Sequence, residues 1–497
     1  MKTRERVLIG IVIVIVGVLS VILGFKKVGY NVDEIWNYGL ANHVGGPTLD
    51  VELRREYSGM GPFEDYMEVN SGQGFDYVNV WKNQAADVHP PFYYLIFHTV
   101  CSFFPNTFSK WYGIALNILW MAAIMVMLYK LAKEITGSEL KSFGIILAYG
   151  TSVIFLNTIV FIRMYTQFAF FTISLTYLFK HYWDKELDKK FYRLFAIVTV
   201  LGMLTHYYFL IFSFFMCLCF AINLIRNKRY IELRKSIITA VGSGVFYLII
   251  WYHIGGHLFR GYRGQQAISQ ALSLGGLFKG AKGLFKAINK EGFWGLIWSF
   301  VIVFAVLIVI KVRKKEKLWC LESSLLICCI LYVLVVGKIA PFTADRYVMC
   351  TAFGFIMIGY LAVSELVATF VDTKYAACVA LLVFVVINSG NLISRGFSVP
   401  NCYNNEELLA TMSFMEDKEA VVYIKEEWDT WNSYYFYAPL LRAKSYCIVD
   451  ETIAQDVFDS KKDYMLLTYT SEPEGVIEGL DAELVYKTGS SYYYYVH

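Results

Sequence analysis

The sequence predicts a mainly α-helical membrane protein: a polytopic transmembrane bundle of about 11 spans followed by a small α/β domain. Of 497 residues, 57% are hydrophobic and only 17% are charged. A soluble protein normally carries about a quarter charged residues, so this charge content is low for a soluble protein. The apolar residues form long runs separated by short polar segments, which indicates membrane spans. From about residue 396 the apolar runs give way to short alternating segments. The net charge of +4 does not indicate a nucleic-acid partner.

The first apolar run, Val7 to Phe25, is long enough to cross a bilayer. Basic residues precede it, as in a signal peptide, but no small-x-small cleavage site follows. We therefore predict an uncleaved first helix with a cytoplasmic N-terminus.

The topology depends on the segment 92–104, which is apolar but has only 13 residues where a span needs about 20. If this segment does not cross the membrane, the loops on the cytoplasmic side carry 19 Lys and Arg residues in total and the loops on the outer side carry 10. The positive-inside rule favours this distribution. We expect an interfacial or re-entrant helix begun by Pro90 and Pro91. The spans then fall near residues 7–25, 111–131, 142–162, 164–181, 192–207, 208–225, 237–254, 294–312, 319–339, 348–370 and 375–394.

This topology gives a transmembrane domain over 1–395, with a first outer loop over 26–110 and a basic outer loop over 255–293. In the basic loop, lysines recur at helical spacing among apolar residues, at Lys279, Lys282, Lys286 and Lys290. This pattern predicts a helix in the lipid headgroup layer, and substrate gating is the alternative.

Residues 396–497 predict a small extracytoplasmic α/β domain. Strands are expected over 420–424, 446–449, 464–469 and 492–496, and helices over 406–415 and 428–441. Cys402 and Cys447 fall in this domain, where an oxidising compartment would permit a disulfide between them.

An acidic pair, Asp33 and Glu34, follows the end of the first helix. A carboxylate placed there can take a proton from an acceptor hydroxyl as it attacks a sugar C1, which is general base catalysis. The alternatives are an acid kept outside by topology, or an ion pair with Lys26 or Lys27.

The second loop element is Asp87-Val88-His89-Pro90-Pro91. The prolines restrict the backbone and start a helix, so Asp87 and His89 are expected at its mouth. The imidazole can donate to a phosphate or to the acceptor. A satisfied polar histidine and a helix-capping aspartate are the alternatives.

Cations recur at other junctions expected on the outer face. Arg163 is followed closely by Tyr165 between two apolar runs, where arginine is costly unless it meets an anion or snorkels. Guanidinium binds phosphate bidentately. Further candidates on this face are His206, Lys338, Arg346 and Tyr347.

These residues together predict a phosphate leaving group held by cations while a carboxylate activates the acceptor. No P-loop or dinucleotide fingerprint is present, which favours a sugar attached to a lipid phosphate.

At these positions the chain resembles the GT-C glycosyltransferases, in particular bacterial relatives of the protein O-mannosyltransferases and of the lipid A aminoarabinose transferase. The matching elements cover roughly residues 1–360 in order: Asp33-Glu34, His89-Pro90-Pro91-Phe92-Tyr93-Tyr94, Arg163-Met164-Tyr165, Thr205-His206-Tyr207-Tyr208 and Arg346-Tyr347.

The resemblance implies an inverting transfer from a polyprenyl-phosphate sugar at the outer face of a bacterial cytoplasmic membrane, with Asp33 as general base. The expected catalytic residues are Asp33, Glu34, Asp87 and His89. The expected substrate-binding residues are Arg163, Tyr165, His206, Lys338, Arg346 and Tyr347. No metal or other cofactor is expected, with a weakly bound divalent cation as the alternative. The acceptor is a glycan, a glycolipid or a protein. No β-trefoil module interrupts the chain, so the sequence does not support a protein acceptor.

A second hypothesis is a lipid or polysaccharide transporter whose outer cations bind a phosphate that is moved and not cleaved. A third is a non-catalytic assembly partner with a degenerate site.

Overall fold

The structure is a computed structural model that describes residues 2–273, 275–316 and 318–497. The chain divides into two compact units. We call residues 1–22, 88–93 and 114–399 the helical unit, and residues 23–87, 94–113 and 400–497 the α/β unit. The α/β unit thus combines most of the first outer loop with the C-terminal domain.

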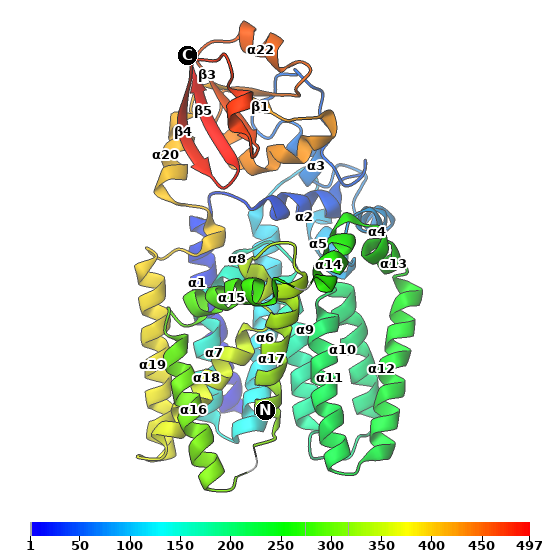
Figure 1. The fold of residues 1–497 in the computed structure, drawn as a ribbon, viewed down its shortest axis with the longest axis vertical. Coiled ribbons are helices and arrows are strands. Elements are labelled where there is room, and N and C mark those ends of the chain that lie inside the picture. Colours follow the sequence, from blue (N-terminus) through cyan, green and yellow to red (C-terminus); the bar gives the residue numbers. More distant parts are fainter. Residues whose placement is uncertain (1, 274, 317) are drawn as a thin grey trace. The chain divides into compact units, whose positions relative to one another are not determined.

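The helical unit is built of long and short helices (Figure 1). They are α1 (Thr3–Lys26), α6 (Lys110–Thr136), α7 (Glu139–Gly150), α8 (Val153–Val160), α9 (Tyr165–His181), α10 (Lys189–Thr205), α11 (Phe209–Arg226), α12 (Tyr230–Ile250), α13 (Ile254–Phe259), α14 (Tyr262–Leu272), α15 (Leu277–Ala287), α16 (Ile297–Arg313), α17 (Leu321–Ile339), α18 (Ala352–Val367) and α19 (Thr373–Ser394).

The described residues contain 6 helices that are long and apolar enough to cross a membrane, or up to 8 if each of two bent pairs forms one span. The predicted span over 142–162 is broken into α7 and α8, which are bent by 58°. α9, α10 and α18 coincide with three more predicted spans but have only 17, 17 and 16 residues. The mainly helical membrane fold is therefore confirmed, whereas the number of 11 spans and the side on which each end lies stay predictions.

The predicted helix in the basic loop is present as α15, which a π-helical turn over Ile288–Gly292 extends. Ala281, Leu284 and Ile288 are buried, whereas the ring of Phe278 is 80% exposed. The backbone of α15 lies close to the backbone of α17. A Cβ placed on Gly280 of α15 would lie only 1.8 Å from the carbonyl oxygen of Gly337 of α17. Glycine at both positions therefore permits this contact. The placement of α15 in a headgroup layer stays a prediction.

In the α/β unit, the first outer loop forms short helices, α2 (Val32–Asn42), α3 (Phe63–Met67), α4 (Tyr77–Ala86) and most of α5 (Phe92–Ser102). α5 begins directly after the two prolines, as the sequence predicts. Its 11 residues correspond to a length of roughly 16 Å, which is too short to cross the hydrocarbon core of a bilayer.

The C-terminal part of the same unit forms a five-stranded sheet in the order β2-β1-β3-β5-β4 (Figure 1). The strands are β1 (Glu419–Tyr423), β2 (Ser445–Val449), β3 (Tyr464–Tyr469), β4 (Ala482–Thr488) and β5 (Ser491–Val496). β1 pairs in parallel with β2 and β3, whereas β5 pairs antiparallel with β3 and β4. The four predicted strands are confirmed and β4 was missed, because its largely exposed residues lack a clear buried face.

Helices cover this sheet, namely α20 (Glu406–Phe414), α21 (Tyr437–Leu440), α22 (Ala454–Ser460) and α23 (Pro473–Val476). The helix predicted over 428–441 is instead a 3-10 segment, Glu427–Phe436, followed by α21. The first outer loop pairs with the edge of β2, where the backbone groups of Tyr57 and Tyr446 exchange hydrogen bonds of 2.7 and 2.8 Å. Cys402 and Cys447 are both buried and are not bonded to each other.

Candidate functional site

The acidic pair of the first outer loop lies at the start of α2, where Asn31 forms a capping box. The Asn31 side-chain oxygen accepts the backbone N–H of Asp33 at 3.0 Å, and the Glu34 carboxylate accepts the backbone N–H of Asn31 at 2.8 Å. This reciprocal pattern fixes the first turn of the helix. Carboxylates here are also favoured by the positive end of the helix dipole.

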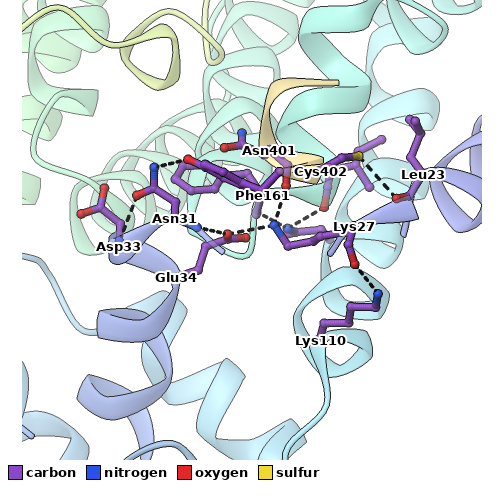
Figure 2. A network of polar contacts seen from close by, with 12 residues as sticks. Leu23, Lys27, Asn31, Asp33, Glu34, Lys110, Phe161, Asn401 and Cys402 are labelled. Atoms are coloured by element: carbon purple, nitrogen blue, oxygen red, sulfur yellow. Dashed lines mark hydrogen bonds and ion pairs between the residues drawn. The ribbon is translucent and has the colours of Figure 1, made fainter. Parts of the chain in front are cut away.

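Glu34 forms a buried ion pair with Lys27 (Figure 2). The Lys27 ammonium donates to the Glu34 carboxylate at 2.8 Å and to the Asn401 carbonyl at 2.5 Å, and both charged side chains are fully buried. The Lys110 ammonium donates to the Lys27 carbonyl at 2.6 Å. Removing one partner of such a pair leaves a buried charge, which costs about 3–5 kcal/mol. The ion pair with Lys27, which the sequence left open, is therefore present for Glu34.

Asp33 differs from its neighbour in exposure and direction. Its side chain is half-buried, and Figure 2 shows its carboxylate pointing away from the one that Lys27 binds. Asn31 connects this turn to the C-terminal residues, because its amide donates to the Tyr403 hydroxyl at 2.6 Å. Asp33 is thus the more exposed of the two acids on this helical turn.

Asp87 lies at the C-terminal end of α4, where its backbone N–H donates to the Asn83 carbonyl at 3.0 Å. Burial, followed by the neighbouring Tyr434 and then by the negative charge of Asp87, raises the pKa of the Tyr66 hydroxyl. The chain passes from the α/β unit to the helical unit directly after Asp87. Asp87 and His89 are therefore close in the chain but belong to different units.

In the helical unit, the side chains of His89 and Arg163 are in contact. The Arg163 guanidinium lies 3.2 Å from the His89 Nε2, which accepts a hydrogen bond from it. Arg163 lies in the turn between α8 and α9 and is only 2% exposed. Because Nε2 accepts, the proton of the neutral imidazole is on Nδ1.

His206 lies beside this pair, in the turn between α10 and α11. Its ring is 6.3 Å from the His89 ring and is stacked on Phe168 at 4.9 Å. Its Nδ1 accepts the backbone N–H of Tyr208 at 3.0 Å, so the neutral ring carries its proton on Nε2. Burial, followed by the nearby His89, Arg163 and Arg346, holds the pKa of His206 well below its ordinary value. His206 is therefore a neutral donor close to two guanidinium groups.

Arg346 and Tyr347 belong to a 3-10 turn after α17. The Arg346 guanidinium lies over the rings of Phe342 and Tyr347, at 5.2 and 5.5 Å. The Tyr347 ring contacts the Tyr208 ring at 5.5 Å, which connects this turn to the His206 turn. We call His89, Arg163, Tyr165, His206, Arg346 and Tyr347 the arginine cluster.

Lys338, the remaining predicted cation, lies near the end of α17. Its ammonium donates to the carbonyl and hydroxyl oxygens of Ser273, at 2.6 and 2.7 Å. These bonds connect the end of α17 to Ser273, and the substrate-binding role of Lys338 stays a prediction.

The sequence did not point to an acidic pair beside the turn of Arg346, formed by the buried Glu291 and the half-buried Asp345. The Asn157 amide donates to Asp345 at 3.0 Å and to Glu291 at 3.2 Å. Asp345 also accepts the backbone N–H of Arg346 at 2.7 Å, so this pair supports the turn that carries Arg346. Glu291 is the single acidic residue in the basic loop 255–293, and this exception to the loop's charge was the signal that could have identified it.

The structure thus brings six predicted residues together in the arginine cluster, and it places Asp33, Glu34 and Asp87 in the α/β unit. Among the residues that the structure describes, no three His, Cys, Asp or Glu side chains converge in a way that could hold a metal ion.

No family model matches the sequence, and no curated protein matches it significantly. Among solved structures, ArnT from Cupriavidus metallidurans bound to undecaprenyl phosphate matches with a TM-score of 0.54 and 11% identity, over 100% of this chain and 98% of that one. The chain shares the ArnT fold. The apo form of ArnT matches with a TM-score of 0.53 at 9% identity, over 97% of each chain.

A second protein with a similar fold is the archaeal oligosaccharyltransferase AglB from Archaeoglobus fulgidus, in complex with an inhibitory peptide and a dolichol-phosphate. It matches with a TM-score of 0.51 and 10% identity, over 96% of this chain and 71% of that one. The fold that the sequence resemblance implied is therefore confirmed.

Proposed function

We propose that the protein is a membrane glycosyltransferase that moves a sugar from a polyprenyl-phosphate donor to an acceptor hydroxyl at the outer face of the membrane, with inversion at C1. The observation that carries the proposal is the arginine cluster, in which Arg163, Arg346 and a neutral His206 donor lie together in a chain with the ArnT fold. The ArnT structure holds undecaprenyl phosphate and AglB holds a dolichol-phosphate, both of which present a lipid phosphate.

The proposed chemistry follows from these groups. The guanidinium groups of Arg163 and Arg346 bind the phosphate and stabilise the charge that develops on it as the bond to C1 breaks. Asp33 takes the proton from the acceptor hydroxyl, whose oxygen forms the new bond to C1. Glu34 positions this turn through its ion pair with Lys27.

Binding of undecaprenyl phosphate to the full-length protein in nanodiscs tests the phosphate site. Arg346→Gln and Arg163→Gln are each expected to weaken binding about 10- to 100-fold, because a hydrogen bond to a charged group contributes about 1.5–3 kcal/mol. Lys282→Gln, an exposed cation on α15, is the matched control and should bind as the wild type does. Unchanged binding by both arginine variants would remove the phosphate site from the arginine cluster.

Broken helices also occur in transporters, and α15 with its π-helical extension is bent by 95° against α16. The same nanodisc protein, reconstituted in vesicles, therefore tests the alternative. Movement of labelled polyprenyl phosphate between leaflets without sugar transfer would favour a transporter over the enzyme.

A further inference from the structure

The α/β unit contains a cleft of about 520 Å³ that no part of the proposed donor site uses. Residues 29–32 of the first outer loop form one wall, and residues of the C-terminal domain form the others. Its main feature is a set of tyrosines: Tyr30, Tyr403, Tyr435, Tyr469, Tyr486 and Tyr493. The size falls in the range of small-molecule sites.

Two pairs of the tyrosine rings that line the cleft contact each other. Tyr435 and Tyr469 are stacked face to face, with ring centroids 4.0 Å apart and an angle of 4° between planes. Both residues are half-buried and line the cleft. The Tyr486 ring contacts the Tyr493 ring at 5.3 Å, and its hydroxyl accepts a hydrogen bond from the Asn405 amide at 3.3 Å.

The lining of this cleft carries no charge. None of its described residues is an Asp, Glu, Lys, Arg or His, although the chain as a whole contains 45 basic and 41 acidic residues. The other polar groups are hydroxyls and amides, including Asn31, Asn405 and Ser491. A phosphate, a carboxylate or an ammonium group would bind here without an opposite charge, so the lining favours a neutral ligand.

A phenol presents an apolar face and a polar edge. A pyranose ring has the complementary surface, with C–H groups on its faces and hydroxyls around its edge. A cleft lined by tyrosines together with neutral hydroxyl and amide groups therefore fits a saccharide. An extended peptide would bind mainly through backbone hydrogen bonds to a strand edge. Phenol side chains dominate the lining of this cleft, which favours a saccharide over a peptide.

The position of the cleft connects it to Asp33. Asn31 and Val32 line it, and Asp33 is the next residue, held by the Asn31 side chain at 3.0 Å. We propose that this cleft binds a neutral saccharide of the acceptor and presents one of its hydroxyls to Asp33. This inference rests on the proposed glycosyltransferase function and names the acceptor class for it.

In the proposed sugar transfer, the acceptor hydroxyl displaces the polyprenyl phosphate from C1 of the donor sugar. The acceptor oxygen forms a bond to C1 of the donor sugar while the bond from C1 to the phosphate oxygen breaks. The polyprenyl phosphate leaves with that electron pair, and the hydroxyl proton moves to the Asp33 carboxylate.

The test is binding of a glycan array of neutral and acidic oligosaccharides to the full-length protein in nanodiscs, without donor, followed by titration of the bound glycan. Wild type should bind a neutral glycan. Tyr435→Ala and Tyr469→Ala should each weaken binding about tenfold through the lost ring face. Tyr435→Phe keeps the ring and should stay within about threefold of wild type, which separates lost stacking from misfolding.

Tyr495→Ala is the matched control, because Tyr495 is a half-buried residue of the same domain that bonds Asp463 and does not line the cleft. It should bind as the wild type does. Binding of no neutral glycan, binding of acidic glycans only, or equal affinity in the tyrosine variants would overturn the proposal. Binding of a peptide library in place of glycans would overturn it in favour of a peptide acceptor.

Glycan binding is measured without donor, so it is independent of the binding of undecaprenyl phosphate. Loss of glycan binding with intact binding of undecaprenyl phosphate refutes the cleft alone. Intact, tyrosine-dependent glycan binding in a protein that neither binds the lipid phosphate nor transfers sugar refutes the proposed function alone.

Discussion

Lys27 in the α/β unit and Arg163 in the helical unit are equally buried, each being 2% exposed, but their surroundings differ. Lys27 donates to the Glu34 carboxylate and a backbone carbonyl, so its charge is compensated within the fold. Arg163 donates to the His89 imidazole and lies near the His206 imidazole, whose pKa is lowered by burial and then by the nearby charged groups. Two cations of equal burial thus meet different groups within their own units, a carboxylate for Lys27 and an imidazole for Arg163.

The largest effect is expected at Asp33, which shares the turn with the structural Glu34. Asp33→Asn should lower sugar transfer about 10²- to 10⁴-fold, because it removes the proposed general base while keeping the shape of the side chain. The measurement is turnover with a polyprenyl-phosphate sugar in nanodiscs. The thermal unfolding midpoint should stay near that of the wild type. Turnover close to wild type would remove Asp33 from the base role.

At Glu34 the main effect is expected on stability. Glu34→Gln should reduce the free energy of unfolding by about 3–5 kcal/mol, because the buried Lys27 charge loses its partner. A double variant, Lys27→Met with Glu34→Leu, removes both charges and should recover part of that loss. Denaturant unfolding of the purified protein measures both. A double variant less stable than the single one would show that the pair stabilises the fold in its own right.

A smaller, pH-dependent effect is expected at His206. Burial and the neighbouring cations lower the pKa of its imidazole in the folded state, so below about pH 6.5 the unfolded chain binds a proton that the folded chain does not. Stability should therefore fall as the pH falls below 6.5, by about 1.4 kcal/mol per pH unit for this single group. Thermal unfolding between pH 7.5 and 5 measures the slope. His206→Asn keeps an acceptor for the Tyr208 N–H and should flatten it; an unchanged slope would assign the effect to other groups.

The smallest effect is expected at an exposed ion pair of the C-terminal domain. Arg442 and Glu416 are separated by 3.3 Å, and each side chain is 55% exposed. Glu416→Gln should change the free energy of unfolding by less than about 1 kcal/mol, because solvent screens the pair. Denaturant unfolding of Glu416→Gln and Glu34→Gln compares the loss of unfolding free energy at the exposed pair with the loss at the buried pair. A loss as large as that of Glu34→Gln would contradict the distinction between buried and exposed pairs.

The sequence by itself determined the elements whose pattern is local. Apolar runs located the membrane helices, the two prolines located the start of α5, and alternation located four of five strands. Residue chemistry also selected Arg163, His206 and Arg346 as candidates, because an arginine between apolar runs is costly and therefore conspicuous in a sequence.

Only the tertiary structure decided how these candidates divide. It placed Glu34 in an ion pair with Lys27 and left Asp33 half-buried, although the two acids are neighbours in the chain. It also brought the tyrosines of distant segments around one cleft and set Asn157 between Glu291 and Asp345. The physical reason is that hydrophobic periodicity reports whether a residue is buried, whereas the partner that a buried polar group meets depends on long-range packing that one sequence does not encode locally.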